Sequence, residues 1–178
     1  MKTFLSACVI IMAVSTPASP QQSRENPLSH SVPNINLSLD LGSRDLMASA
    51  LGDVETSVSA VIYKFDDPLL MPTLLKALNR GIKFQIICDE KESRKKASLI
   101  GELAQAGAEI RLWPRSQGKL HAKFVLCDHN RVLTGSWNWT KSAGGNNLEI
   151  LMDIKDDETV ATFNGVFARL WKMSHPRM

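Results

Sequence analysis

The feature that most constrains the fold is residues 82–89 (IKFQIICD), a run that is apolar almost throughout. A strand of this kind is expected where both faces of a sheet are covered, because a half-exposed strand alternates apolar and polar residues. A second apolar strand is expected at residues 58–65. Between the two, a helix is expected to begin at residues 66–68 (DDP) and to end before Gly81. The chain should therefore fold in layers of helix and sheet.

The rest of the chain continues this alternation of strands and helices and then becomes rich in strands. Strands are expected at residues 34–39, 109–113, 121–127, 131–135 and 148–153, and helices at 43–51 (with Ser43 as N-cap), 93–105 and 157–173. This order indicates an α/β fold of the α+β sandwich kind, with a mixed β-sheet flanked by helices. A chain of 178 residues suits one domain, which we expect at residues 34–178.

The N-terminus differs from the rest of the chain. Lys2 precedes eleven uncharged residues, 4–14, and small residues follow them. This pattern predicts a secretory signal peptide at residues 1–18 and a flexible lead-in at 19–33, so we expect export to a periplasm or the medium. The alternative is a membrane anchor at residues 4–14, although that run is short for a bilayer. After cleavage Cys88 and Cys127 remain, either as one disulfide or as two buried thiols.

Positive charge gathers in one window of the chain. Residues 111–141 hold six basic residues and one acidic residue, a net charge of +5, which leaves −2 for the remainder of a chain whose total is +3. Such a concentration suits an anionic substrate, whereas a merely solvated basic face is the alternative.

A group of polar residues with fixed spacing lies inside this window. The pattern is H-x-K-x4-D-x6-G-S-x-N, formed by His121, Lys123, Asp128, Gly135, Ser136 and Asn138. Side chains two residues apart in a strand share a face, so His121 and Lys123 should project together, as should Ser136 and Asn138. An imidazole beside an ammonium, a hydroxyl and an amide offers a nucleophile and charge stabilisation, which cleavage of a phosphodiester requires.

Other polar and aromatic residues adjoin this pattern. Asn147 and Glu149 should share one face of the strand at 148–153, where a carboxylate could fix the tautomer of a neighbouring imidazole. Trp137 and Trp139 alternate with the polar residues and should fill the core, with base stacking as the alternative. His129 should be exposed in a turn.

At this point the sequence resembles the phospholipase D superfamily, and HAKFVLCDHNRVLTGSWNWTKSAGGNNLEI is similar to its short, single-motif, bacterial endonuclease branch. The resemblance extends from about Val58 to the last helix. It implies a phospholipase D/nuclease-like fold and a phosphohistidine mechanism that needs no metal and no other cofactor. It also implies the roles of the site residues. His121 is the nucleophile, Glu149 orients it, and Asp128 is the motif aspartate, expected among the catalytic residues but supporting the loop more than the chemistry. The residues that bind the phosphate are Lys123, Ser136 and Asn138, with Asn147 close to it.

A single motif is not sufficient for this chemistry. A second imidazole must protonate the leaving oxygen and then activate water. His30, His129 and His175 have no lysine two residues further on, so none of them begins a second motif. The resemblance therefore implies a homodimer, with the active site at the two-fold interface.

Three classes of function remain open. The first is a nonspecific endonuclease on DNA or RNA, supported by the single motif and the basic window. The second is a phospholipase D or cardiolipin hydrolase, which should present an apolar ridge near the site; residues 69–75 (LLMPTLL) are the nearest candidate. The third is a binding module without catalysis, for which a broken motif is expected, whereas this motif is intact. The sequence leaves the choice of substrate open.

Overall fold

The structure is a computed structural model that describes residues 34–39, 42–145 and 147–177. Residues 31–178 form one structural unit. The predicted signal peptide, the alternative anchor at 4–14 and the lead-in at 19–33 lie outside the described residues. The elements are β1 (Asn34–Leu39), α1 (Gly42–Asp53), β2 (Ser57–Ile62), α2 (Met71–Asn79), β3 (Lys83–Asp89), α3 (Glu90–Ser93), α4 (Ile100–Gln105), β4 (Glu109–Trp113), the 3-10 turn η1 (Arg115–Gln117), β5 (Phe124–Cys127), β6 (Arg131–Gly135), β7 (Leu148–Ile154), α5 (Asp157–Met173) and β8 (His175–Pro176).

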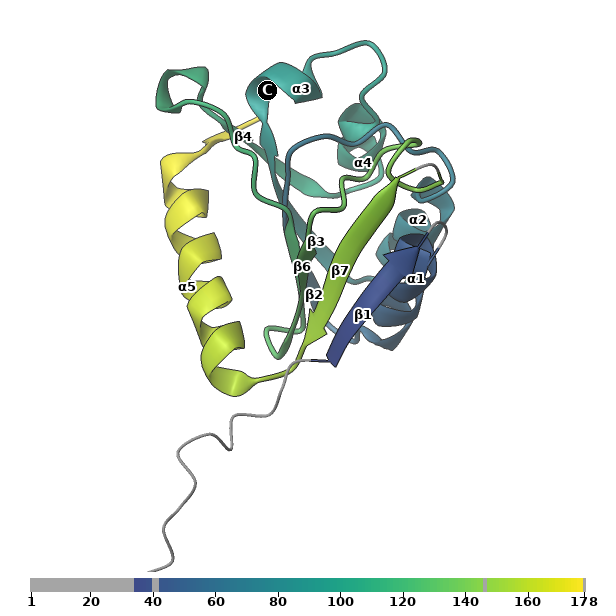
Figure 1. The fold of residues 1–178 in the computed structure, drawn as a ribbon. Coiled ribbons are helices and arrows are strands. Elements are labelled where there is room, and N and C mark those ends of the chain that lie inside the picture. Colours follow the sequence, from purple (N-terminus) through teal and green to yellow (C-terminus); the bar gives the residue numbers. More distant parts are fainter. Residues whose placement is uncertain (1–33, 40–41, 146, 178) are drawn as a thin grey trace, which may run out of the picture. The chain divides into compact units, whose positions relative to one another are not determined.

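The strands form one eight-stranded sheet in the order β1-β7-β6-β5-β2-β3-β4-β8. Strands β2, β3 and β4 are parallel to one another, and every other pairing is antiparallel. Helices α1, α2 and α4 lie on one side of the sheet, and α5 lies on the other (Figure 1). The predicted mixed sheet flanked by helices is confirmed.

Strand β3 shows why its sequence is almost continuously apolar. Neighbouring residues Ile86 and Ile87 point to opposite faces, and both are fully buried. Ile86 joins the core beneath α1, α2 and α4, which includes Leu74, whereas Ile87 joins the core beneath α5, which includes Phe167. Burying a side chain of this size contributes about 2 kcal/mol, so both layers stabilise the strand.

The predicted helix at 66–80 begins later than expected, at Met71. The carboxylate of Asp67, instead of capping a helix, pairs with Arg44 at 2.6 Å and accepts a hydrogen bond from the Leu69 amide at 3.1 Å. These contacts hold residues 68–70 as a turn, and the helix starts only after it.

The predicted helix at 93–105 is also wrong, because it is two short helices, α3 and α4. Asp89 caps α3 by accepting from the Glu92 amide. Between the two helices the Leu99 amide donates to the Phe65 carbonyl at 3.0 Å, a contact with a segment far away in the sequence. This tertiary bond replaces the local bonds that a continuous helix would have required.

Two strands are shorter than predicted, and one cap is wrong. Strand β2 ends at Ile62 rather than at residue 65, and β5 begins at Phe124 rather than at residue 121. Ser43 lies inside α1, and among the described residues its buried hydroxyl has no hydrogen-bond partner. In contrast, α5 has the predicted bounds and is capped by Asp156, which accepts from the Thr159 amide at 2.8 Å.

Cys88 and Cys127 are both buried as free thiols, and they lie beside opposite ends of β2. Burial raises the pKa of each thiol to about 12, so both are inert at neutral pH. Of the two alternatives for these cysteines, the structure shows the buried thiols.

Candidate functional site

The register of β5, β6 and β7 brings the motif together at one edge of the sheet. Phe124 pairs with Thr134, so Lys123 lies next to the end of β6. Gly135 pairs with Leu151, so the chain after β6 lies next to Glu149 near the start of β7. The parallel strands β2, β3 and β4 also end at this edge, where functional groups of α/β sheets commonly gather.

Glu149 is the buried acceptor of this site. The Ser136 hydroxyl donates to its Oε2, and Asn147 Nδ2 donates to its Oε1 at 3.1 Å. Ser136 Oγ in turn accepts from the Ile150 amide at 3.0 Å. The backbone approach is so close that a Cβ at Gly135 would collide with the Ile150 carbonyl oxygen, so only glycine fits there.

Lys123 is half-buried beside this group. Its ammonium donates to the His121 carbonyl oxygen at 2.6 Å. Desolvation lowers the pKa of Lys123, while the nearby charge of Glu149 acts in the opposite direction. Glu149 therefore lies close enough to Lys123 to stabilise its cationic form.

His121 is exposed, and among the described residues neither of its ring nitrogens has a hydrogen bond. Its pKa is lowered, first by desolvation and then by the charges of Lys123 and Lys119. A lowered pKa keeps the imidazole neutral at neutral pH, which is the state that can attack an electrophile. The predicted bond between Glu149 and His121 is absent from the described contacts, so this role of Glu149 stays a prediction.

Tyr63 is a site residue that the sequence pattern missed. Its ring contacts the His121 ring edge-on, with centroids 4.7 Å apart at 65°. The ammonium groups of Lys119 and Lys123 lie 5.3 and 5.6 Å from its centroid, within the range of cation–π attraction. Its hydroxyl donates to Glu92 Oε1 at 3.3 Å. Only the position of Tyr63 directly after β2 could have indicated this role, because the end of β2 pairs with the start of β5, close to the motif.

Asn138 and the two tryptophans lie where the alternation predicted. Trp137 and Trp139 are buried in the core, and Trp139 packs edge-on against Phe65 with centroids 5.4 Å apart. These anchors hold residues 136–139 against the sheet. Asn138 is half-buried, and its Oδ1 atom is a buried acceptor without a partner in the described part of the chain.

Asp128 lies at the opposite edge of the sheet from the other motif residues. Strand β5 separates it from Lys123 by five residues, roughly 16 Å of extended chain. Its carboxylate accepts four hydrogen bonds of 2.6–2.9 Å from residues 55–57, three from amides and one from the Thr56 hydroxyl. These bonds lower its pKa to about 2. As a catalytic candidate Asp128 does not reach the site; it fixes the β5–β6 turn, where its own φ is +49°.

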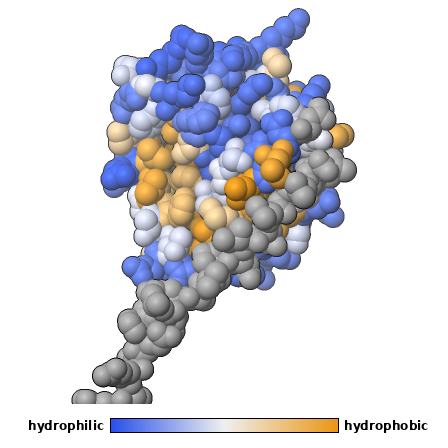
Figure 2. Space-filling model, viewed as in Figure 1, coloured by the Kyte–Doolittle hydropathy of each residue, from blue (hydrophilic) through white to orange (hydrophobic). Residues whose placement is uncertain are grey.

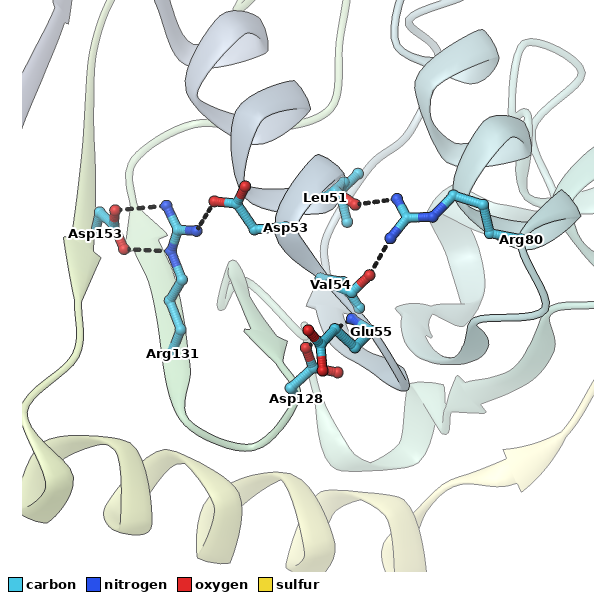
Figure 3. A network of polar contacts seen from close by, with 8 residues as sticks. All are labelled: Leu51, Asp53, Val54, Glu55, Arg80, Asp128, Arg131 and Asp153. Atoms are coloured by element: carbon cyan, nitrogen blue, oxygen red, sulfur yellow. Dashed lines mark hydrogen bonds and ion pairs between the residues drawn. The ribbon is translucent and has the colours of Figure 1, made fainter.

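Part of the basic window is engaged within the fold and is not free to bind a substrate. Arg131 is buried and forms ion pairs with Asp153 at 2.7 Å and Asp53 at 3.0 Å (Figure 3). Arg111 donates to the Trp171 carbonyl at 2.6 Å and lies over the Trp171 ring. The cations that remain for a substrate are therefore Arg115, Lys119, Lys123 and Lys141. His129 is exposed in the turn, as predicted, and contacts Asn164 at 2.7 Å.

No cluster of three or more histidine, cysteine or carboxylate side chains in residues 34–39, 42–145 and 147–177 is arranged to hold a metal ion. Within the same ranges, no helix has the length and apolar character needed to cross a bilayer.

Comparison with known proteins gives similar relatives over most of the chain. The family described as "Cardiolipin synthase, PLD-like domain" matches residues 47–171. The mitochondrial cardiolipin hydrolase of Xenopus laevis is 30% identical over 168 residues, which are 94% of this chain and 75% of that protein. The human protein of the same name is 32% identical over 127 residues, 71% of this chain but only 50% of its own length.

The fold is similar to that of solved structures. Nuc from Salmonella typhimurium, described as a phospholipase D family member, superposes with a TM-score of 0.74 at 26% identity, over 82% of this chain and 97% of Nuc. NucT from Helicobacter pylori has the same fold, with a TM-score of 0.71 at 24% identity, over 81% of this chain and 99% of NucT.

Proposed function

This chain belongs to the phospholipase D superfamily of phosphodiester hydrolases, and we propose that it is a metal-independent phosphodiesterase that acts through a phosphohistidine and cleaves DNA or RNA as a nonspecific endonuclease. One observation carries the proposal. His121 is an exposed imidazole with a lowered pKa and no hydrogen bond on its ring nitrogens in the described structure, and it stands beside the ammonium of Lys123.

The first step follows from the positions of these groups. A ring nitrogen of His121 attacks phosphorus, and the bond from phosphorus to the leaving oxygen breaks as that oxygen takes a proton. Lys123, Ser136 and Asn138 bind the non-bridging oxygens, where negative charge grows in the transition state. Water then attacks the phosphohistidine and gives its proton to the second imidazole, which lost its own proton to the leaving oxygen; the bond from phosphorus to nitrogen breaks, and neutral His121 is restored.

Glu149 supports this site in two ways. It accepts hydrogen bonds from the Ser136 hydroxyl and the Asn147 amide in the described structure, which holds both groups beside the phosphate position. The Ser136 proton must turn from Glu149 to a phosphate oxygen when the substrate binds. The charge of Glu149 also favours the cationic form of Lys123, against the desolvation that lowers the pKa of that lysine. Its role in orienting His121, which the family resemblance implies, belongs to the proposal and requires a rearrangement of the site on substrate binding.

A second copy of the chain supplies the proton donor. Each chain has one His121-Lys123 motif, whereas the leaving oxygen needs a second imidazole. Leu148 and Ile150, which flank Glu149 on β7, are 70% and 44% exposed. Apolar residues also gather over β7 in the space-filling view (Figure 2). Exposed apolar side chains on the strand that carries Glu149 suit a contact with a second copy of the chain. The proposal requires that this contact be two-fold and place two copies of His121 face to face.

A second candidate substrate is a phospholipid. The relatives named mitochondrial cardiolipin hydrolase support it. Leu69, within the residues considered as an interfacial ridge, is 67% exposed, and an apolar group of this kind can insert into a membrane surface. We favour nucleic acid, because Arg115 and Lys119 are exposed close to Tyr63 and neither forms an ion pair among the described residues, which suits a substrate with several phosphates.

We also infer export of the chain, from the charged start and short apolar run of residues 1–18. Fractionation of cells that express the full chain, with N-terminal sequencing of the product, tests this inference. Processing near residue 18 supports a cleaved leader, and an intact N-terminus in the membrane fraction supports an anchor at residues 4–14.

Incubation of purified protein with circular DNA in excess EDTA tests the main proposal. The native chain should nick and linearise the DNA, and His121→Ala should abolish cleavage. His129→Ala is the matched control, because His129 is an exposed histidine at the opposite edge of the sheet. Dependence on added metal, or cleavage by His121→Ala, would contradict the mechanism. Intact DNA together with headgroup release from liposomes would favour the phospholipid.

A further inference from the structure

A hollow of about 310 Å³ lies next to His121 on the side of α3 and the loop after β4. Tyr63 forms one wall, and its ring also contacts His121, so the hollow and the nucleophile share this residue. Lys91, Arg115 and Lys119 complete the rim. This hollow is separate from the Ser136 and Asn138 side of the site.

The charges around the hollow do not cancel. Its two carboxylates are buried and already engaged: Asp89 accepts from the Glu92 amide at 3.0 Å and the Leu120 amide at 3.1 Å, and Glu92 pairs with Lys95 at 2.7 Å. Lys91, Arg115 and Lys119 are exposed. Across the described residues, none of these three side chains forms an ion pair with a carboxylate.

The rim is also held in place before any ligand binds. The Asp89 bond to Leu120 fixes one end of the loop after β4. At the other end the Arg115 amide donates to Glu90 Oε2 at 3.2 Å, and Gly118 turns the chain with a φ of +84°. A cationic hollow with fixed walls binds an anion at a lower entropic cost than free surface lysines do.

We propose that this hollow is a subsite for the phosphate adjacent to the scissile one, so that the preferred substrate is a strand of repeated phosphodiesters. This inference rests on the proposed function of His121. Lys91 and Arg115 bind the neighbouring phosphate, and Lys119 lies between the two phosphates against the Tyr63 ring. A nucleic acid fits better than a lipid, because charged side chains and one phenol line the hollow and an acyl chain would find no apolar wall.

Two short substrates that differ by one phosphodiester test the subsite. Thymidylyl-thymidine has a single phosphodiester, and the trinucleotide of thymidine has two. We expect the native chain to cleave the trinucleotide with a kcat/KM about fivefold higher, measured in EDTA at fixed low salt. The ratio of the two kcat/KM values is corrected for the two cleavable bonds of the trinucleotide. In the double variant Lys91→Gln/Arg115→Gln this corrected ratio should fall to about one.

The matched control is Lys83→Gln/Lys155→Gln. It removes the same two positive charges, but at the opposite edge of the sheet, where Lys83 opens β3 and Lys155 follows β7; both side chains are exposed. This variant should keep the native ratio. An equal loss in both double variants would overturn the subsite, because only the net charge would then matter.

The remaining outcomes separate the subsite from the proposed function. If the native chain cleaves both substrates with equal kcat/KM for each bond, the subsite is overturned, whereas the proposed phosphodiesterase function stands. Failure to cleave either substrate or circular DNA overturns the proposed function and this inference with it. Lys91→Gln/Arg115→Gln could instead lose activity on cardiolipin but keep it on phosphatidylglycerol, and leave the ratio for the two nucleotides unchanged. That result overturns nucleic acid as the occupant of the hollow in favour of a lipid with two phosphates.

Discussion

Asp128→Asn should destabilise the fold without removing the chemistry, although Asp128 belongs to the motif. The substitution keeps one acceptor oxygen but places an amide donor against backbone amides of residues 55–57, and it removes the charge that strengthens the remaining bonds. A carboxyl group with a pKa of about 2 in the fold and 3.8 as a free side chain contributes about 2 kcal/mol at neutral pH. Partial exposure of the group reduces this value to about 1.5 kcal/mol.

Urea denaturation at pH 7 measures this effect directly, and the melting temperature should fall by about 3–6 °C. Because folding lowers the pKa of Asp128, its contribution is complete above pH 3.8 and disappears as the pH falls toward 2. The difference between native and variant chains should therefore vanish in that window. Glu55→Gln is the control, since it removes an exposed neighbouring carboxylate whose side chain has no hydrogen bond in the described structure. A large loss of kcat in fully folded Asp128→Asn would refute the reasoning.

Three further predictions concern the site. Tyr63→Leu should lower kcat about tenfold, because the ring that orients His121 is lost, whereas Tyr63→Phe should stay within about threefold; steady-state kinetics of both variants decides. Because neutral His121 attacks, the acid limb of the pH–rate profile should lie below pH 6.5, the pKa of an ordinary histidine. Lys119→Gln removes a charge that lowers the pKa of His121, so it should move this limb to higher pH, and an unchanged limb contradicts the prediction. Glu149→Gln should reduce activity at least tenfold through Ser136 and Lys123, and retention of full activity would exclude Glu149 from the site.

The local elements of the fold could be predicted where local physics decides them. The continuous apolar run of β3 indicated a strand covered on both faces, and both faces are covered. The amphipathic pattern of residues 157–173 predicted the bounds of α5 correctly. In contrast, α2 starts late because Asp67 pairs with Arg44, and the helix after β3 breaks because Leu99 binds Phe65. Neither partner is local, so no window of sequence reveals them.

The site was partly visible in the sequence for a similar reason. Spacing within one hairpin and its neighbour brought Lys123, Ser136 and Glu149 together, because strand register converts spacing into proximity. Tyr63 could not be found in this way, since its contact with His121 depends on the order of β2 and β5 in the sheet. The net charge of residues 111–141 overestimates the positive charge available to a substrate. Arg131 is buried in ion pairs with Asp53 and Asp153, which come together only in the folded chain.

The central claim is that phosphorus becomes covalently bound to His121. Rapid acid-free quenching of the chain with a 5′-labelled oligonucleotide in EDTA, followed by mass spectrometry of peptides, tests it most directly. We expect an adduct on the peptide that holds His121, stable in alkali, labile in acid and absent from His121→Ala. Efficient cleavage with no adduct at any time, or an adduct on a different residue, would contradict it.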